Sequence, residues 1–419
     1  MTLEENIQEI GKKAKAASRK LMAASPKAKN LALTKLAKLL DAERKTILDA
    51  NTKDMQAASE SNMDSARLDR LRLTDAIIDE MIKACKHVQN LPDPVGAIST
   101  QWQRPNGLLV GRMRIPLGVI AMIYEARPNV TIDASILCLK AGNAVILRGG
   151  SEALNSNLAL AKLLYQALEY ANLPIDSAQI LDTTDRNAVN TLCKMDNYID
   201  VLIPRGGEAL VRRVTEMATM PVLKHYMGVC HAYIDKSADL KQALKIIFNS
   251  KVQRPGVCNA LECLLVHEKV ADKLLPKIAK KLGKARVEFR ACAKSLTLLG
   301  KTAIAQKESD LGQEFHELIL AVCIVKSLDE AIKHIACYGS GHTEIICTNN
   351  HKNAMRFMRE VDASMTAVNA STRFNDGGQL GLGAEIGIST SKLHSYGPMG
   401  VEELTTTKFV VFGTGQIRE

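Results

Sequence analysis

The sequence predicts an α/β protein whose sheets are mostly parallel. A helical block comes first: between residues 3 and 88, Leu33, Leu36, Leu40 and Ile47 recur at helical spacing, and Lys and Glu fill the other faces. From about residue 108 onward, short apolar segments alternate with longer amphipathic ones. This alternation is typical of strands and helices in layered α/β domains.

The elements follow in order along the chain. Two prolines in residues 91–96 (Leu-Pro-Asp-Pro-Val-Gly) end the helical block. After them, apolar runs predict strands, and apolar residues at helical spacing predict the helices between them. The predicted strands are 108–113, 119–124, 144–147, 178–181, 201–203, 261–266, 318–325 and 343–348, and the predicted helices are 154–170, 208–217, 328–336 and 354–360.

The bulk composition is that of a globular protein. The 419 residues suffice for two or three domains with separate cores. They are 46% apolar and 24% charged, and no apolar run approaches the ~20 residues of a membrane helix. The acidic N-terminus lacks a signal-peptide pattern. None of the ten cysteines forms a Cys-x-x-Cys pair, which disfavours zinc and disulfide sites and predicts a cytoplasmic location.

The formal net charge of +10 allows three interpretations. The lysines form solvated surfaces without a partner, or they steer an anionic substrate and a phosphorylated cofactor, or they bind nucleic acid. Basic residues are scattered among acids, and only 4% of residues are aromatic, so stacking platforms for single strands are scarce. The charge therefore disfavours nucleic acid and leaves the first two interpretations open.

Cys258 is the foremost candidate for a catalytic residue. It lies directly after a Pro-Gly turn and before what begins either a helix or a buried segment. This position exposes the sulfur beside its own backbone N–H, and amides at a helix start would also favour the thiolate. From the residues alone the alternative is an ordinary buried cysteine, as Cys263 in the following apolar run is expected to be.

The segment around Cys258, Gln-Arg-Pro-Gly-Val-Cys-Asn-Ala-Leu-Glu (253–262), resembles the nucleophile segment of the γ-glutamyl phosphate reductases, a branch of the aldehyde dehydrogenase superfamily. The resemblance extends over nearly the whole chain. Other motifs that carry it, in order, are Ile115-Pro-Leu-Gly-Val119, Tyr124-Glu-Ala-Arg-Pro-Asn-Val130, Leu147-Arg-Gly-Gly-Ser151, Ile203-Pro-Arg-Gly-Gly207, Val368-Asn-Ala-Ser-Thr-Arg-Phe374 and Gly397-Pro-Met-Gly400.

The resemblance implies an aldehyde dehydrogenase-like fold, with two Rossmann-like α/β domains and a small oligomerisation hairpin and tail. The implied NADP(H)-binding domain, with the N-terminal helices, covers residues 1–97 and 116–230. The hairpin and tail cover 98–115 and 397–419, and the catalytic domain with Cys258 covers 231–396. A homo-oligomer, dimer or tetramer, is expected.

Two strand-to-helix turns are the candidates for cofactor binding: Arg148-Gly149-Gly150-Ser151 and Arg205-Gly206-Gly207. Each places backbone amides, a helix N-terminus and a guanidinium together, where an anion binds. A simple tight turn is the alternative. The glycines between 381 and 387 do not form a Gly-x-Gly-x-x-Gly fingerprint and open no βαβ unit, so they are rejected as a dinucleotide motif.

The resemblance identifies the cofactor as NADPH/NADP⁺. Arg148 stands where the superfamily commonly has a ribose-binding lysine, and a guanidinium can hold a 2′-phosphate through two parallel hydrogen bonds. Glu314 matches by position the glutamate that binds the nicotinamide ribose; a surface acid before a strand is the alternative.

The implied reaction is the NADPH-dependent reduction of γ-glutamyl phosphate to glutamate 5-semialdehyde with release of phosphate, the second step of proline biosynthesis. Cys258 would attack the acyl carbonyl, and its backbone N–H and the Asn129 side chain would bind the oxyanion. Hydrolytic relatives carry a glutamate in the segment that corresponds to residues 221–228, which here contains no carboxylate. This favours a phosphorylating enzyme that preserves its thioester.

Charged and hydroxyl side chains in the matching loops are the candidates for substrate binding: Glu125, Arg127, Ser371, Thr372 and Arg373. No metal site is expected, because His225, His231 and His394 lack metal-ligand spacing, and core or surface histidine is favoured for them. At Tyr396 many relatives have arginine, and no role is transferred to it.

Two rival hypotheses remain. One is a CoA-acylating or hydrolytic semialdehyde dehydrogenase on the same fold, and the other is a basic nucleic-acid-binding protein without catalysis. The expected partner is a small-molecule substrate, and a functional coupling to glutamate 5-kinase is considered. No nucleic-acid or membrane partner is expected.

Overall fold

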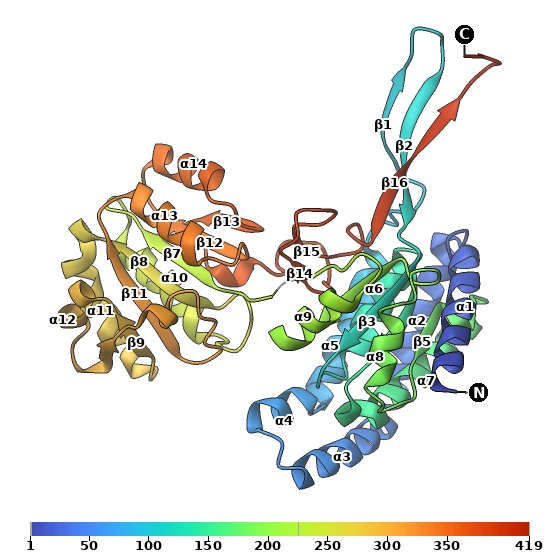
Figure 1. Ribbon diagram of the computed structural model, residues 1–419, viewed down its shortest axis with the longest axis horizontal. Coiled ribbons are helices and arrows are strands. Elements are labelled where there is room, and N and C mark those ends of the chain that lie inside the picture. The colour runs from blue at the N-terminus through green and yellow to red at the C-terminus, as the bar shows by residue number, and fades with distance from the viewer. Residues whose placement is uncertain (1, 225, 419) are drawn as a thin grey trace. The chain divides into compact units, whose positions relative to one another are not determined.

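The computed structural model describes residues 2–224 and 226–418, which form two compact units (Figure 1). Unit 1 contains the chain up to Lys224, Gly381–Gly387 and the segment from Met399 onward; unit 2 contains the rest. The domain boundary predicted after residue 230 falls at the first residue of β7 (Cys230–Ile234), a strand of unit 2. The predicted catalytic domain, residues 231–396, includes residues 381–387, but in the structure these residues belong to unit 1.

Unit 1 begins with the expected helical block. A capping box between Thr2 and Glu5 starts the first helix, and the Ser25 hydroxyl caps the second, as the side chains of serine and threonine do at helix starts. Leu33, Leu36 and Leu40 are completely buried, which confirms the helical spacing. The five helices are α1 (Leu3–Leu21), α2 (Pro26–Ala42), α3 (Arg44–Glu60), α4 (Ser65–Leu71) and α5 (Asp75–Asn90).

A four-stranded parallel sheet forms the centre of unit 1. Its order is β5 (Ala178–Ile180), β4 (Ala144–Arg148), β3 (Val119–Tyr124) and β6 (Val201–Arg205). Successive side chains of β3 alternate between two apolar clusters, one under α2, α5, α6 and α7 and the other under α1, α8 and α9. Both faces are covered, so the strands read as continuous apolar runs. The remaining helices are α6 (Val130–Lys140), α7 (Leu154–Tyr170), α8 (Asn187–Leu192) and α9 (Glu208–Met217).

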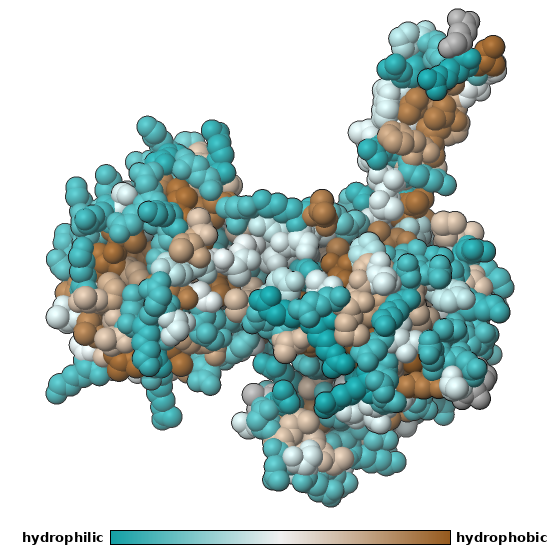
Figure 2. Space-filling model, in the orientation of Figure 1, coloured by the Kyte–Doolittle hydropathy of each residue, from teal (hydrophilic) through white to brown (hydrophobic). Residues whose placement is uncertain are grey.

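A separate antiparallel sheet extends from unit 1 (Figure 1). It consists of β1 (Ile98–Gln103), β2 (Leu109–Pro116) and β16 (Thr405–Phe412), in that order, and joins the predicted hairpin to the C-terminal segment. Figure 2 shows apolar side chains on its surface. Large apolar residues that are at least 40% exposed on these strands are Ile98, Trp102, Phe409, Val411 and Phe412.

Unit 2 is built on a seven-stranded, wholly parallel sheet. Apolar residues from one face pack under α10 and α11, and those from the other under α13 and α14 (Figure 1). The strand order is β10 (Ala303–Ala305), β9 (Glu288–Ala291), β11 (Ile319–Val325), β8 (Leu261–His267), β7, β12 (Thr343–Cys347) and β13 (Met365–Val368). The helices are α10 (Leu240–Val252), α11 (Glu268–Lys284), α12 (Ala293–Leu299), α13 (Leu328–Tyr338) and α14 (His351–Glu360), and a short pair is β14 (Ile388–Ser389) with β15 (Gly397–Pro398).

The α/β prediction with mostly parallel sheets is confirmed. Every predicted strand overlaps an observed one, and the predicted helix 354–360 begins earlier, at His351, because the Asn350 side chain caps it. Among the described residues, no helix has both the length and the apolar content needed to span a membrane.

Candidate functional site

Three loops at one edge of the unit 1 sheet carry most of the residues predicted to bind cofactor and substrate. The neighbouring strands β4, β3 and β6 run parallel, so their carboxyl ends lie on the same edge. Arg148 and Arg205 are the last residues of β4 and β6, and their glycines lead toward α7 and α9. Residues 125–129 follow β3, between the two turns. The structure therefore brings both Gly-Gly turns and Glu125, Arg127 and Asn129 to one place.

Hydrogen bonds join these loops to one another. The backbone N–H of Ala126 donates to Glu152 Oε1 at 2.7 Å, and that of Gly207 donates to Glu125 Oε2 at 3.0 Å. A Cβ on Gly206 would lie 2.6 Å from the Glu125 carboxylate, which explains the glycine there. Because Glu125 already occupies the Gly207 amide, an anion at this second turn would have to displace a carboxylate of the chain itself.

The Arg148 turn fits an anionic group better. Arg148 is only 8% exposed, and its guanidinium donates one hydrogen bond, to the carbonyl of Gly149 at 2.9 Å. Its Nε–H finds no acceptor among the described residues, and burial lowers the pKa of the guanidinium. A Cβ on Gly149 would lie 2.1 Å from the Asn157 side chain, so the close approach of α7 requires glycine. Gly150 and the exposed Ser151, the first residue of a 3₁₀ turn (Ser151–Ala153), complete the turn.

Asn129 precedes α6 at its N-terminus and is half-buried. Its side-chain amide donates to Asp133 Oδ2 at 2.8 Å, one turn further along the helix. Asp133 is half-buried, and desolvation raises its pKa to about 6, while Asn129 and Arg205 act in the opposite direction. Asp133 thus orients the amide and engages one of its two N–H groups. The predicted contact of the other N–H with an oxyanion stays a prediction.

Cys258 lies in unit 2, in a turn between α10 and β8. The expectation that it begins a helix is wrong: the chain enters the fully buried strand β8, so helix-start amides do not act on the sulfur. The alternative expectation, a buried segment after the cysteine, is confirmed. Cys258 itself is half-buried, whereas Cys263 is buried within β8 as expected.

The backbone around Cys258 is tightly held. The Cys230 thiol donates to the Cys258 carbonyl at 3.1 Å, and a Cβ on Gly228 would lie 2.1 Å from the same carbonyl oxygen. Asn259 donates through its side chain to the carbonyl of Asn375 at 2.9 Å. These contacts fix the turn from two sides, which is what a positioned nucleophile requires.

The loop with Ser371, Thr372 and Arg373 packs against this turn. The Arg373 Nε–H donates to the Gln253 side chain at 2.8 Å, and the guanidinium interacts electrostatically with Cys258. Ser371 is buried; its hydroxyl lies 2.9 Å from that of Ser250 and caps a short 3₁₀ turn (Thr372–Phe374). Thr372 is fully buried. The Arg373 guanidinium therefore lies within electrostatic range of Cys258. Phosphate contacts from the two hydroxyls stay predictions.

A buried charged cluster lies behind the turn, and sequence reasoning did not single it out. Lys251 Nζ lies 2.7 Å from Glu262 Oε2, and both side chains are at most 1% exposed. Glu314 interacts electrostatically with both, and its side chain is only 10% exposed, so it is not a freely solvated surface acid. The feature that marks the cluster in the sequence is a glutamate inside strand β8, whose other residues are apolar up to the terminal His267.

The predicted site residues are thus divided between the two units. Asn129, Arg148, Arg205 and their neighbours belong to unit 1, and Cys258, Glu314 and Arg373 belong to unit 2. The expected approach of Asn129 to Cys258 stays a prediction.

Comparisons with known proteins agree with this architecture. The model of the aldehyde dehydrogenase family matches residues 2–295. A γ-glutamyl phosphate reductase from Nitratidesulfovibrio vulgaris is 68% identical over 419 residues, which is the full length of both chains.

Solved structures agree as well. The crystal structure of a γ-glutamyl phosphate reductase from Thermotoga maritima is 47% identical, covers 99% of this chain and 100% of its own, and superposes with a TM-score of 0.95. An acetylating aldehyde dehydrogenase from Geobacillus thermoglucosidasius, 18% identical with a TM-score of 0.72 over 100% of this chain and 98% of its own, shares the fold.

Proposed function

The chain belongs to the aldehyde dehydrogenase family, among the γ-glutamyl phosphate reductases, and from this premise we propose that it reduces γ-glutamyl phosphate to glutamate 5-semialdehyde with NADPH and releases phosphate. It is an oxidoreductase. The proposal assigns it to proline biosynthesis in the cytosol, in agreement with cysteines that are all free among the described residues.

The observation that carries the proposal is the state of Cys258. It is half-buried, fixed by its backbone and within electrostatic range of the Arg373 guanidinium, whereas most other cysteines are buried in apolar surroundings. A positive charge beside a sulfur stabilises a negative charge on it, and the thiolate is the nucleophile. Seven of the ten cysteines are buried, and the two others outside the core, Cys292 and Cys337, lie outside the matching segment.

Cys258 would attack the acyl-phosphate carbonyl. A carbon–sulfur bond forms, the bond from carbon to the phosphate oxygen breaks, and phosphate departs with the electron pair, which leaves a thioester on Cys258. The Cys258 backbone N–H and the free N–H of Asn129 would donate to the oxyanion. The segment 221–228 holds no carboxylate to activate water, so the thioester persists until it is reduced.

Bound NADPH would supply the hydride for reduction of this thioester to the aldehyde, and Cys258 would leave as the thiolate. The residues of unit 1 fit such a cofactor: the Nε–H of the buried Arg148 has no acceptor within the described parts of the chain, and the Gly149-Gly150 turn admits a close approach of the backbone. Glu314 would bind the nicotinamide ribose. Arg205, Gly206 and Gly207 would act at the second turn, with the Glu125 carboxylate displaced.

Substrate binding is assigned to groups that match the ends of glutamyl phosphate. Glu125 would pair with the ammonium group, and Arg127 and Arg373 with the carboxylate and phosphate. Ser371 and Thr372 would shape the loop that carries Arg373. The exposed apolar residues of the β1–β2–β16 sheet support a homo-oligomer, dimer or tetramer. Coupling to glutamate 5-kinase remains part of the proposal.

The reverse reaction tests the proposal. Glutamate semialdehyde, supplied in its cyclised form with NADP⁺, should generate reduced nicotinamide only when phosphate is present. Cys258→Ser should lower turnover by at least about 10³-fold. Cys337→Ser, at an exposed position on α13, should leave it unchanged. Activity that ignores phosphate and needs CoA or neither supports the rival dehydrogenases, and salt-sensitive nucleic-acid binding without turnover supports the non-enzyme.

A further inference from the structure

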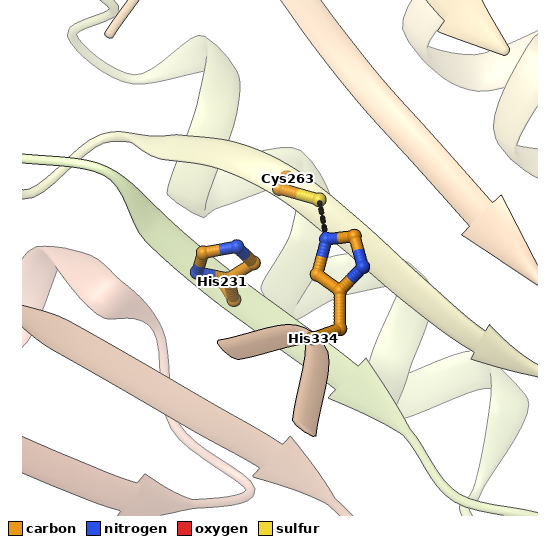
Figure 3. Close-up of side chains that lie close together, drawn as sticks. All are labelled: His231, Cys263 and His334. Carbon is orange, nitrogen blue, oxygen red and sulfur yellow. Dashed lines mark hydrogen bonds between the residues drawn. The ribbon is translucent and has the colours of Figure 1, made fainter. Parts of the chain in front are cut away.

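Three metal-ligating side chains from three elements converge on one face of the unit 2 sheet. They are His231 on β7, Cys263 on β8 and His334 on α13, and their ligand atoms lie within 4.8 Å of one another (Figure 3). His231 and Cys263 are partners in adjacent parallel strands, so both leave the sheet on the same face. The helix that covers this face supplies His334.

The surroundings of His231 provide an independent observation. Both His231 and Glu344 are completely buried. Glu344 accepts from the His231 backbone N–H at 2.9 Å, and His231 Nδ1 lies 3.0 Å from the same carboxylate oxygen. A carboxylate that accepts from Nδ1 leaves the lone pair on Nε2. That Nε2 is buried and finds no hydrogen-bond partner among the described residues.

We propose that Nε2 of His231, Sγ of Cys263 and Nε2 of His334 bind one Zn²⁺ ion. Glu344 then acts as the outer carboxylate that orients a metal-bound histidine, a common arrangement at zinc sites. One thiolate and two imidazoles suit zinc, whereas Mg²⁺ and Ca²⁺ require oxygen ligands. The Cys263 thiolate and the Glu344 carboxylate together balance the two positive charges of the ion inside a buried region.

The geometry is near what zinc requires. Bonds of about 2.0–2.1 Å to nitrogen and about 2.3 Å to sulfur place tetrahedral ligand atoms roughly 3.3–3.7 Å apart. Cys263 Sγ and His334 Nε2 already lie 3.6 Å apart. The remaining separations between ligand atoms are at most 4.8 Å, and binding of the ion would require small side-chain rotations to shorten them. On binding, the Cys263 thiol proton passes to solvent, and water ligands of the ion are released. One sulfur–metal bond and two nitrogen–metal bonds form, and the contact between Cys263 and His334 is lost.

The site is separate from the proposed nucleophile. Cys258 is not among its ligands, and His334 is only partly buried, so an ion can reach the cluster from the surface of α13. Because the ligands come from two strands and the covering helix, a bound ion links α13 to the sheet. An ion that binds only the folded chain raises its stability by mass action.

The test uses the full chain freed of metal by a chelator. Equilibrium dialysis should show one tight equivalent of Zn²⁺, Co²⁺ should produce a thiolate-to-cobalt absorption band in the near ultraviolet, and Zn²⁺ should raise the unfolding temperature by several degrees. Cys263→Ser and His334→Ala should each lose all three effects. If circular dichroism shows that Cys263→Ser does not fold, His334→Ala provides the test, because His334 is only partly buried. Cys258→Ser and Cys337→Ser should retain them.

The contrary results are equally clear. If the wild-type chain binds no tight zinc equivalent, the proposed site is absent. If the equivalent and the cobalt band survive Cys263→Ser or His334→Ala, the ion binds elsewhere. If they disappear in Cys258→Ser, the ion sits on the nucleophile and the proposal is overturned. Because none of these measurements uses turnover, they are independent of the proposed function.

Discussion

Lys251 and Glu262 form a fully buried ion pair, 2.7 Å between Nζ and Oε2, at the two ends of the loop that carries Cys258. Lys251 lies in the last turn of α10 and Glu262 is the second residue of β8. Burial lowers the pKa of the lysine and raises that of the glutamate to about 7. The pair therefore links both anchors of the proposed nucleophile turn across the interior of unit 2.

Breaking this pair should destabilise the protein more than removing it. Lys251→Met leaves the Glu262 carboxylate buried without its partner, and we expect a loss of about 3–5 kcal/mol in the free energy of unfolding. The double variant Lys251→Met, Glu262→Leu removes both charges and should recover at least half of that loss. Urea unfolding of the single and double variants measures the difference. A double variant no more stable than Lys251→Met would contradict the ion-pair explanation.

Gly228→Ala should displace the Cys258 turn. The added methyl group would lie 2.1 Å from the Cys258 carbonyl oxygen, so the backbone must move. We expect turnover to fall by about tenfold or more, because small displacements of reacting groups are costly. Gly256→Ala, in the loop that carries Cys258, is the matched control, since its methyl group would meet only the His316 carbonyl oxygen at 3.6 Å. Equal activity of the two variants would show that the turn tolerates movement.

Asp133 should make the stability of unit 1 depend on pH. Burial raises its folded pKa to about 6 from a reference value of 3.8. A raised pKa means that its stabilising contribution is complete below pH 3.8 and is lost as the pH rises through 6. The side chain introduced by Asp133→Asn cannot ionise. The free energy of unfolding of this variant, relative to that of the wild type, should therefore increase between pH 4 and 7, by up to about 3 kcal/mol.

Denaturant unfolding at several pH values tests this expectation. The exposed Asp182→Asn serves as the control, and its profile should follow that of the wild type. Parallel profiles for Asp133→Asn and the wild type would mean that Asp133 ionises as readily in the folded chain as in the unfolded one.

The sequence predicted the layered fold because both sheets are covered by helices on both faces. Strands such as β3 and β8 are therefore apolar at every or nearly every position, and helices such as α1 begin with capping residues. It left open whether a helix or a buried segment begins directly after Cys258. A Pro-Gly turn followed by apolar residues leads equally well into a helix or a strand. The segment becomes strand β8 because it pairs with the parallel strands β7 and β11, which are distant in the chain.

For the site residues too, the sequence predicted local segments but not contacts between distant ones. Local motifs located the Arg148 and Arg205 turns, because each turn is a continuous segment. The Lys251–Glu262 pair and the cluster of His231, Cys263 and His334 are assembled by strand register and helix docking. Cys263 and His334 are 71 residues apart, a separation without any metal-binding spacing.

Arg148 should determine the preference for NADPH over NADH. Its buried guanidinium has an N–H without an acceptor among the described residues, and the 2′-phosphate of NADPH would supply one. Arg148→Met should raise KM for NADPH by about 10- to 100-fold, which corresponds to one charge-assisted contact, and should change KM for NADH less than about threefold. Arg148→Lys retains a charge but not the two parallel hydrogen bonds, so its KM for NADPH should lie between those of the wild type and Arg148→Met. Steady-state kinetics with both cofactors measure the ratio. If KM rises equally for both, Arg148 binds a group that the two cofactors share, because only the 2′-phosphate distinguishes them.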